Sequence, residues 1–580
     1  MNIRKIWSVM WSMICLAAVP GWGFADIVLP PVLSSHMVLQ RDRPVPVWGT
    51  AAPGEQITVE FAGQKKTAVA DAQGTQAPSK DSAVARWKVI LDPMPASSEP
   101  RTMVVAGASG KKELTDILVG EVWVGSGQSN MQQGGGSYTG HDEVIAKMIS
   151  AGPYPQLRLI SSGAKGWMES TPENLKGFSA MLFSFGLPLH KELKVPVGLL
   201  VGAVGGTPSG FWLSQQAYDN DQACQDVVAK STQDQHYAEA LKKYEASLEK
   251  WKQDVEEAKT NNVPKLPKAP QKPIKPGECK GQLGHLYERH IRPYIPYAIR
   301  GVLWDQGESG TAIEGIDQYT LMGALIKGWR KEWGQDFPFI YVQKPSGGGC
   351  AWDPADPVTC RAEKFTALPG GVPSDGKSRA VHIRIMTYPA TFMVTSSDLG
   401  SGVHPVNKSG YGARGARVAL GAVYGRNVEI YGPVYKAHKL DGGKVIVSFD
   451  HVGQGLAVRK NAAAAGSTPS TGSAPSTDSI NSPQAGSGPT GALQAGPGPG
   501  KLQGFAVAGE DGPAPSQDSA VASRKWVWAD AVIEGNTVVV SSAKVAKPVA
   551  VRYAWAGTHP WANLFNKDGL PALPFRTDGP

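Results

Sequence analysis

The sequence predicts an α/β domain with a β-rich region on either side of it. In the middle of the chain, residues 117–424, nearly continuous apolar runs alternate with stretches of helical periodicity, as expected for parallel strands covered on both faces. In the flanking ranges 26–116 and 425–580, short runs of alternating polar and apolar residues are separated by Gly, Pro and Asp, a pattern typical of strands joined by turns. A chain of 580 residues can form several such domains.

Residues 1–25 have the pattern of a secretory signal. Arg4 and Lys5 precede an apolar stretch, and Gly23-Phe24-Ala25 offers a small-x-small cleavage site after Ala25. A membrane anchor is the alternative, but the apolar stretch is short and interrupted by Ser and Pro, and no later segment is long enough to span a bilayer. We therefore expect an exported protein, periplasmic or secreted, with no membrane partner after the signal is removed.

Cysteine usage agrees with export. Removal of Cys15 with the signal leaves four cysteines, and an even number in an oxidising compartment predicts two disulfides. Proximity in the sequence favours Cys350 with Cys360, which leaves Cys224 with Cys279. A zinc site is the competing interpretation, but no CxxC spacing or paired histidines support it.

The charge of the chain argues against a nucleic-acid partner. Charged residues make up 19% and hydrophobic residues 41% of the sequence, as in ordinary soluble proteins, and the formal charge of +8 is modest for this length. Lys and Arg are scattered, and no basic stretch is interleaved with aromatic residues.

The range 26–116 is predicted to be a small β-sandwich. Its alternating runs are "PVPVWGTA", "EQITVEFAG", "ARWKVIL" and "RTMVVAG".

Five apolar runs predict the parallel strands of the range 117–424. They are "ILVGEVWVG", "VGLLVGAVGG", "IRGVLWDQG", "FPFIYVQ" and "ATFMVTSSD". A helix is predicted after the third run, because Leu321, Leu325, Trp329 and Trp333 recur at every fourth residue. Sheets of this kind carry their chemistry in loops at the carboxyl ends of the strands. The candidate residues in those loops are Ser129, Gly205-Gly206, Gln306-Gly307-Glu308 and Asp398.

An insertion at 215–285 interrupts this domain. Apolar residues from Tyr237 to Val255 recur at alternating spacings of four and three, which predicts one long helix. Prolines then recur at every third residue from Pro264 to Pro276, the repeat of polyproline II. We expect the proline run to return antiparallel along the helix, with a disulfide closing the base.

The range 425–580 is β-rich, with the runs "KVIVSFD", "GFAVAG", "NTVVVSS" and "VAVRYAW". Within it, residues 461–500 lack aromatic residues and almost lack charge, so they cannot bury enough surface to offset the entropy of ordering. We expect a disordered loop there.

A serine nucleophile needs a base, an acid and donors for an oxyanion. Ser129 follows a buried strand, and His404, in a Gly-rich loop before a helical pattern, is the best candidate for its base. Asp398, six residues earlier, is the nearest acid. Gly206, which can bring its N–H close to a ligand, and the Gln306 amide are candidate oxyanion donors.

Four blocks of the sequence stand out: "GSGQSNMQ", "VGLLVGAVGGTPSGFW", "PYAIRGVLWDQGESG" and "DLGSGVHPVNKSGYGAR". In their order and spacing they resemble the blocks of the sialate O-acetylesterase-like proteins of the SGNH hydrolase superfamily. The similarity extends from "LPPVLSSHMVLQRDRPVPVWG" to "LPALPFRTD", and leaves out the proline-rich insertion and the range 461–500.

The resemblance implies a flavodoxin-like, three-layer α/β catalytic domain that deacetylates O-acetylated sugars through an acyl-enzyme, without a metal or other cofactor. It makes Ser129 the nucleophile and an oxyanion donor, Gly206 the second donor, Gln306 the third and His404 the general base.

This chain departs from the family pattern at several positions. Ser401 stands where the superfamily has its acid, which makes Asp398 the nearest substitute, with Glu308 and Asp305 as competitors. Gly310 stands where the family usually has Asn, and Asp305 where it usually has an aromatic residue.

Three functions compete at the level of the sequence. An exported acetylesterase acting on an O-acetylated oligosaccharide or polysaccharide is favoured, and plant hemicellulose (xylan or xyloglucan) fits at least as well as sialic acid. Ser401 supports the alternative of a non-catalytic glycan-binding protein. A lipase or thioesterase is disfavoured, because the loops carry polar groups, with Trp212 or Trp304 suited to a sugar ring if not simply core.

Overall fold

The computed structural model describes most of the chain. The described residues are 26–71, 84–233, 236–344, 365–400, 402–460, 501–510 and 524–579. The predicted signal, the Cys350–Cys360 disulfide and the predicted disordered loop at 461–500 lie outside these residues.

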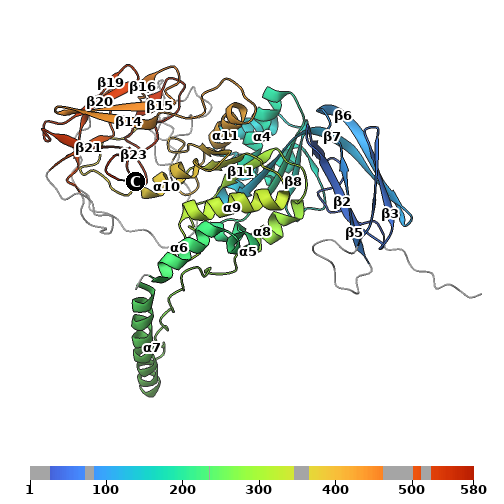
Figure 1. Cartoon of the computed structure of the whole chain (residues 1–580), viewed down its shortest axis with the longest axis horizontal. Coiled ribbons are helices and arrows are strands. Elements are labelled where there is room, and N and C mark those ends of the chain that lie inside the picture. The colour runs from blue at the N-terminus through green and yellow to red at the C-terminus, as the bar shows by residue number, and fades with distance from the viewer. Residues whose placement is uncertain are drawn as a thin grey trace, which may run out of the picture.

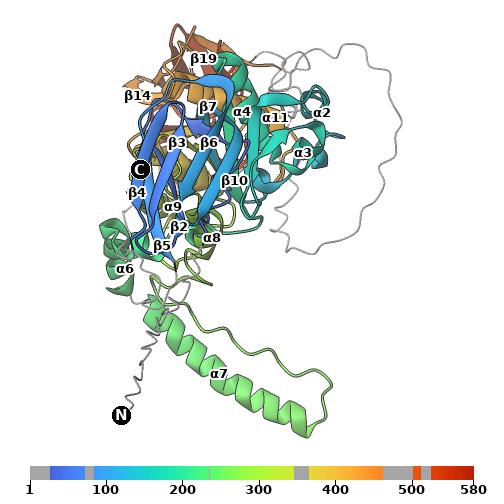
Figure 2. The same cartoon turned by 90° about the vertical axis from the view of Figure 1, so that its right-hand side faces the viewer.

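The α/β part lies at the centre of the molecule, between the N-terminal strands on one side and the C-terminal strands on the other (Figure 1). The long helix α7 (His236–Thr260) projects away from this body (Figures 1 and 2). Within the described ranges, we find no helix with the length and apolar character needed to cross a membrane.

A mixed sheet forms the core of the central part. Its strand order is β13-β12-β11-β7-β10-β8-β9, and neighbours are parallel except for β8 and β9. The strands are β7 (Gly110–Gly127), β8 (Tyr154–Ser161), β9 (Met168–Ser170), β10 (Val197–Ala203), β11 (Gly301–Asp305), β12 (Phe339–Val342) and β13 (Thr391–Val394).

All five strands predicted from apolar runs are present in this sheet, as β7, β10, β11, β12 and β13. Strands β8 and β9 were not predicted. The first half of β8, "YPQL", is partly exposed, and Arg158 interrupts its apolar residues, so its sequence does not show a continuous apolar run.

Strand β7 joins the N-terminal strands to the central sheet. Its first half pairs antiparallel with β6 (Ser97–Gly107), and its second half pairs in parallel with β10 and β11. Strand β1 (Val38–Gln40) also pairs in parallel with β7, with Leu118–Gly120 as the partner residues. The predicted domain boundary at 116/117 therefore falls inside one continuous strand of 18 residues rather than in a linker.

Helices cover both faces of the central sheet. On one face, α4 (Ala180–Leu193) and α11 (Lys408–Ala422) share a hydrophobic cluster with residues of β7, β8 and β10. On the other face, α9 (Gln318–Trp333) buries all four of the residues that predicted it, with α10 (Lys377–Ile385) beside it. The shorter helices are α1 (Ser129–Gln132), α2 (Glu143–Ser150), α3 (Pro172–Gly177), α5 (Gln215–Asp219) and α8 (His285–His290).

The small residues at the start of α11 let it pack closely against α4. A Cβ added to Gly412 would lie 2.4 Å from the Cβ of Ser184 and 2.7 Å from the nitrogen of Phe185. The sequence "GYGARG" thus serves helix packing at this position.

The flanking regions consist of antiparallel strands. Before the central sheet lie β2 (Val45–Ala51), β3 (Gln56–Phe61), β4 (Gln64–Val69) and β5 (Ala85–Leu91). After it, one sheet has the order β14-β15-β20-β19 and another the order β18-β17-β21-β23. Their bounds are β14 (Val434–Asp441), β15 (Lys444–Asp450), β17 (Phe505–Gly509), β18 (Val527–Trp528), β19 (Asp530–Glu534), β20 (Thr537–Ser541), β21 (Pro548–Tyr553) and β23 (Phe575–Arg576), and the short β16 (Leu456–Val458) pairs with β22 (Leu564–Asn566).

The insertion forms the predicted arm. Helix α7 (His236–Thr260) follows α6 (Gln222–Gln233), and the proline-rich chain returns beside it without regular structure (Figure 2). The indole Nε1 of Trp251 donates to the carbonyl of Pro267 over 2.9 Å, so the helix and the return are in contact as expected.

The predicted disulfide at the base of the arm is wrong, because Cys224 and Cys279 are both free thiols. Hydrogen bonds close the base instead. The Tyr218 hydroxyl donates to the carbonyl of Gly277 (2.9 Å), and the N–H of Gly277 donates to the carbonyl of Glu314 (2.9 Å). These bonds hold the returning chain to the central part without a covalent link.

Candidate active site

Ser129 stands at a sharp turn between β7 and α1. The turn is allowed by Gly127, whose φ is +128° and whose Cβ, if present, would lie 2.0 Å from the carbonyl oxygen of Asp305. Because β7 and β11 approach so closely here, only glycine fits. The N–H of Gln128 also donates to the Asp305 carbonyl (2.8 Å), which fixes the turn that presents Ser129.

The structure brings His404 to Ser129. The Nε2 atom of His404 lies 2.8 Å from the Oγ of Ser129, although the two residues are 275 positions apart in the chain. His404 lies in the loop between β13 and α11. The side chain of Asn130 donates to the carbonyl of Val403 (3.1 Å), so the residue after the serine anchors the loop that carries the histidine.

The surroundings of His404 disfavour its protonation. Partial burial lowers the pKa of the ring below its ordinary value of 6.5, although one side of the residue is exposed, and the nearby Lys408 lowers it further. Glu308 opposes this effect, Lys344 adds to it and Asp305 opposes it. A histidine that is neutral at neutral pH can accept a proton from Ser129.

Asp398 does not face His404 in the described structure. Its carboxylate is buried, and both of its oxygens accept from the guanidinium of Arg414 in α11, with Nη2 to Oδ2 at 2.9 Å. A buried carboxylate needs such a cation. The structure thus assigns Asp398 a partner other than the predicted one, and no hydrogen bond to His404 is seen among the described residues.

The two competing carboxylates lie at the end of β11, where Asp305 is the last residue of the strand and Glu308 is on the loop after it, and both act on His404. Lys344, itself buried, is 2.6 Å from Asp305 and 2.8 Å from Glu308. Burial alone would lower the pKa of Lys344, but these two carboxylates raise it above its ordinary value. Glu308 also accepts from the side chain of Gln128 (2.7 Å), which links it to the turn of Ser129.

The backbone N–H groups of Ser129 and Gly206 are the two candidate oxyanion donors. Gly206 lies in the loop after β10, here called the glycine loop (residues 204–208). The N–H of Gly205 in this loop donates to the Oε1 of Gln132 (2.8 Å), and this bond holds the glycine loop against α1. Gly206 follows with φ +70°, and a Cβ added to it would meet no atom within 4 Å. No hydrogen bond within the described ranges uses the N–H of Ser129 or of Gly206.

Gln306 does not present its amide to a ligand. It is buried, and its Nε2 donates to the carbonyls of Thr207 (3.1 Å) and Gly310 (3.3 Å). Both donor hydrogens are thereby committed, so Gln306 ties the glycine loop to the loop after β11 instead of acting as the predicted third donor.

The two candidate sugar-binding tryptophans are core residues. Trp212 and Trp304 are both fully buried, and their rings pack edge to face. The indole Nε1 of Trp212 also donates to the hydroxyl of Thr207 (3.1 Å), and this bond helps to hold the glycine loop in place.

Sequence reasoning missed the two buried lysines of the site. Lys344 directly follows the apolar run "FPFIYVQ", and a charge at the carboxyl end of a buried strand was the available signal. Lys408 lies within the block that supplied His404, as the first residue of α11, but nothing in its local pattern indicated that it is fully buried.

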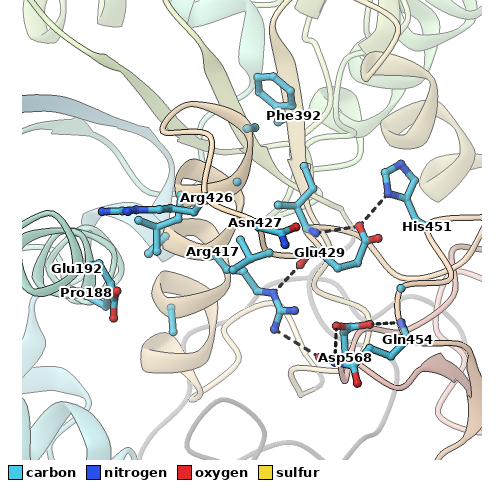
Figure 3. A pocket seen from close by; sticks show the side chains of 18 residues that line it. Pro188, Glu192, Phe392, Arg417, Arg426, Asn427, Glu429, His451, Gln454 and Asp568 are labelled. Carbon is cyan, nitrogen blue, oxygen red and sulfur yellow. Dashed lines mark hydrogen bonds and ion pairs between the residues drawn. The ribbon is translucent and has the colours of Figure 1, made fainter.

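A separate cleft of about 1230 Å³ lies where α4 and α11 meet the C-terminal region (Figure 3). Within it, Arg417 donates to the carbonyl of Glu429 (2.6 Å), and Nδ1 of His451 lies 2.8 Å from the carboxylate of Glu429. Ser129 and His404 do not line this cleft.

One cluster in the described ranges, His36, Asp116 and Glu169, has the spacing of metal ligands. The guanidinium of Arg158 forms an ion pair with Asp116 and lies 3.5 Å from Glu169, so a positive charge is already present there.

The chain is similar in sequence to known proteins. No family model matches the chain. It is 27% identical over 362 residues to the sialate O-acetylesterase of Rattus norvegicus, and 25% identical over 358 residues to that of Homo sapiens. Each match covers 56% of this chain, and it spans 60% and 58% of the respective relative's length.

The solved structure of a carbohydrate acetylesterase from Xanthomonas citri is similar over nearly the whole chain. The TM-score is 0.65 at 27% identity, and the match covers 95% of this chain and 99% of the other. Together these likenesses confirm the family resemblance carried by the four sequence blocks: the chain is similar to sialate O-acetylesterases and carbohydrate acetylesterases, which are carboxylic ester hydrolases.

Proposed function

We propose that the protein is an exported, periplasmic or secreted carbohydrate O-acetylesterase with an SGNH-type catalytic domain and a serine acyl-enzyme mechanism. The hydrogen bond of 2.8 Å between Ser129 and His404 is the observation that carries this proposal. It lies at the carboxyl ends of parallel strands, where α/β sheets place their chemistry.

In the proposed mechanism, Ser129 Oγ attacks the carbonyl carbon of the acetyl ester while His404 Nε2 takes the hydroxyl proton. The N–H groups of Ser129 and Gly206 stabilise the oxyanion that forms, and one such donor typically contributes about 3 kcal/mol to the transition state. His404 then returns the proton to the departing sugar oxygen, which leaves an acetyl-enzyme. A water molecule, deprotonated by His404, releases acetate and regenerates Ser129.

We assign the negative charge that supports protonated His404 to Glu308 rather than Asp398. Glu308 is among the charges that act on His404, and it is tied to the serine turn through Gln128. Asp398 is held by Arg414. Glu308 is one of the two alternatives to Asp398 that the sequence offers.

For the substrate, we favour an acetylated plant hemicellulose (xylan or xyloglucan) over O-acetylated sialic acid. Among the described residues, the charges with the largest effect on His404 are those of Lys408, Glu308, Lys344 and Asp305, and none of these is an arginine. Recognition of the sialate carboxylate would favour a bidentate arginine at the site. The curated relatives are named for sialate, so sialate O-acetylesterase activity is the second candidate.

Acetate release from a panel of native acetylated glycans tests the proposal. We expect release from acetylated xylan or xyloglucan that disappears in Ser129→Ala. Exclusive release from O-acetylated sialic acid would favour the second candidate. Binding to glycans without any release would favour a non-catalytic glycan-binding protein.

A further inference from the structure

Lys408 is a buried cation beside the candidate active site for which the proposed mechanism has no role. Its side chain is fully buried, and lysine is almost never fully buried unless it is paired. Among the described residues, no carboxylate lies within ion-pair distance of it. Its Nζ instead donates to the carbonyl of Pro405 and faces the ring of Tyr138 at 4.9 Å and that of Tyr411 at 5.6 Å.

The carbonyl that Lys408 holds belongs to the residue after His404. The carbonyl of the residue before it, Val403, is held by Asn130 from the serine side (3.1 Å). The histidine is therefore fixed on both flanks, on one by the neighbour of Ser129 and on the other by Lys408. The loop continues into α11, whose first turn is capped by the side chain of Asn407 on the N–H of Gly410 (3.0 Å).

We propose that Lys408 is a positioning residue for His404: its ammonium group fixes the carbonyl of Pro405 and so sets the imidazole against the hydroxyl of Ser129. This inference rests on the proposed function. An apolar side chain of the same length would leave the carbonyl without its donor and free the loop to move. A displacement of about 1 Å in such a site can reduce the rate about 100-fold.

The same placement gives Lys408 an electrostatic effect that a purely structural residue would lack. After burial, its charge is the largest cause of the lowered pKa of His404. Asp305 at the end of β11 and Glu308 on the loop after it oppose this effect, and Lys344, two residues after β12, adds to it. Burial lowers the pKa of Lys408 itself to about 7, with Asp305, Lys344, Glu308 and Asp142 acting on it. Removal of Lys408 therefore makes His404 easier to protonate.

The test compares Lys408→Met, Lys408→Arg and the control Lys377→Met with the wild type. Lys377 is the first residue of another helix, α10, and is exposed. Each protein is assayed for kcat and KM with 4-nitrophenyl acetate across pH, and its fold is checked by thermal unfolding. We expect Lys408→Met to lose about 10- to 100-fold in kcat, with the rising limb of its pH profile moved to higher pH. Lys408→Arg should restore the limb towards its wild-type position, and Lys377→Met should behave as wild type.

A folded Lys408→Met protein with wild-type kcat and an unmoved limb would overturn the inference. If Lys408→Met does not fold, Lys408→Gln is measured in its place, because it keeps a hydrogen-bond donor but carries no charge. A shift of the rising limb of its pH profile to higher pH supports the role of Lys408, and an unmoved rising limb contradicts it. Absence of activity in the wild type, or full activity in Ser129→Ala, would instead refute the proposed function on which the inference rests.

Discussion

At the scale of single residues, the candidate site combines a partly buried serine, an exposed histidine and a group of buried or partly buried charges. Lys344, Asp305 and Glu308 form that group, and Gln128 connects it to the serine turn. Ser129 and His404 thus reach the surface, while the charged groups that act on His404 are held by ion pairs and a hydrogen bond.

The lowered pKa of His404 predicts the pH dependence of activity. The base acts in its neutral form, so kcat/KM should rise with pH as His404 loses its proton. Because the pKa lies below the ordinary value of 6.5, the rising limb should be centred below that pH. A pH series of kcat/KM with 4-nitrophenyl acetate checks this, and a limb centred above 7 would contradict it.

The carboxylate assignment predicts opposite behaviour for two substitutions. Glu308→Gln should lower kcat by about two orders of magnitude or more, because protonated His404 loses a supporting charge. Asp398→Asn should instead destabilise the protein by about 3–5 kcal/mol, because it leaves buried Arg414 without its counter-charge. Steady-state kinetics and urea unfolding of both variants separate the two roles. A catalytic loss confined to Asp398→Asn would restore Asp398 as the acid.

At the scale of elements, the site depends on tight contacts between the ends of β7, β10 and β11 and on the seating of α11. The strands were predictable because burial on both faces forces continuous apolar runs. The loops after β7 and β13 bring Ser129 and His404 within hydrogen-bond distance, and the donor role of Gly206 stays a prediction. The partners of Asp398 and Gln306 were not predictable. Their hydrogen bonds depend on which long side chain reaches them across the fold, and local sequence does not specify this.

The contact between α11 and α4 gives a stability prediction. Gly412→Ala should destabilise the protein by about 1–3 kcal/mol, since the added Cβ would lie 2.4 Å from that of Ser184. Gly177→Ala is the matched control, because a Cβ there meets no atom within 4 Å. Urea unfolding measures both. Equal stability of the two variants would show that the close approach does not constrain α11.

At the scale of the whole molecule, the N-terminal strands are joined to the central sheet through β7, whereas the arm stands apart from it (Figures 1 and 2). The two strand-rich ends and the arm were predictable from composition and periodicity. The continuity of β7 was not, because a change from alternating to continuous burial within one strand resembles a domain boundary in the sequence.

The arm should be dispensable for folding and chemistry. A Cβ on Gly315 would approach both Ser231 and Pro276, so the two ends of the arm lie close together. Replacement of residues 236–273 by a short Gly-Ser linker should therefore preserve the thermal unfolding transition and the kcat for 4-nitrophenyl acetate. Loss of folding in this variant would show that the arm is part of the core.

The central claim is that Ser129, activated by His404, forms a covalent intermediate. The most direct measurement is peptide mass spectrometry after reaction with a fluorophosphonate, which traps serine nucleophiles. We predict a single adduct on the peptide that contains Ser129, greatly slowed in His404→Ala and absent in Ser129→Ala. Continued release of acetate from an unlabelled Ser129 would contradict the account.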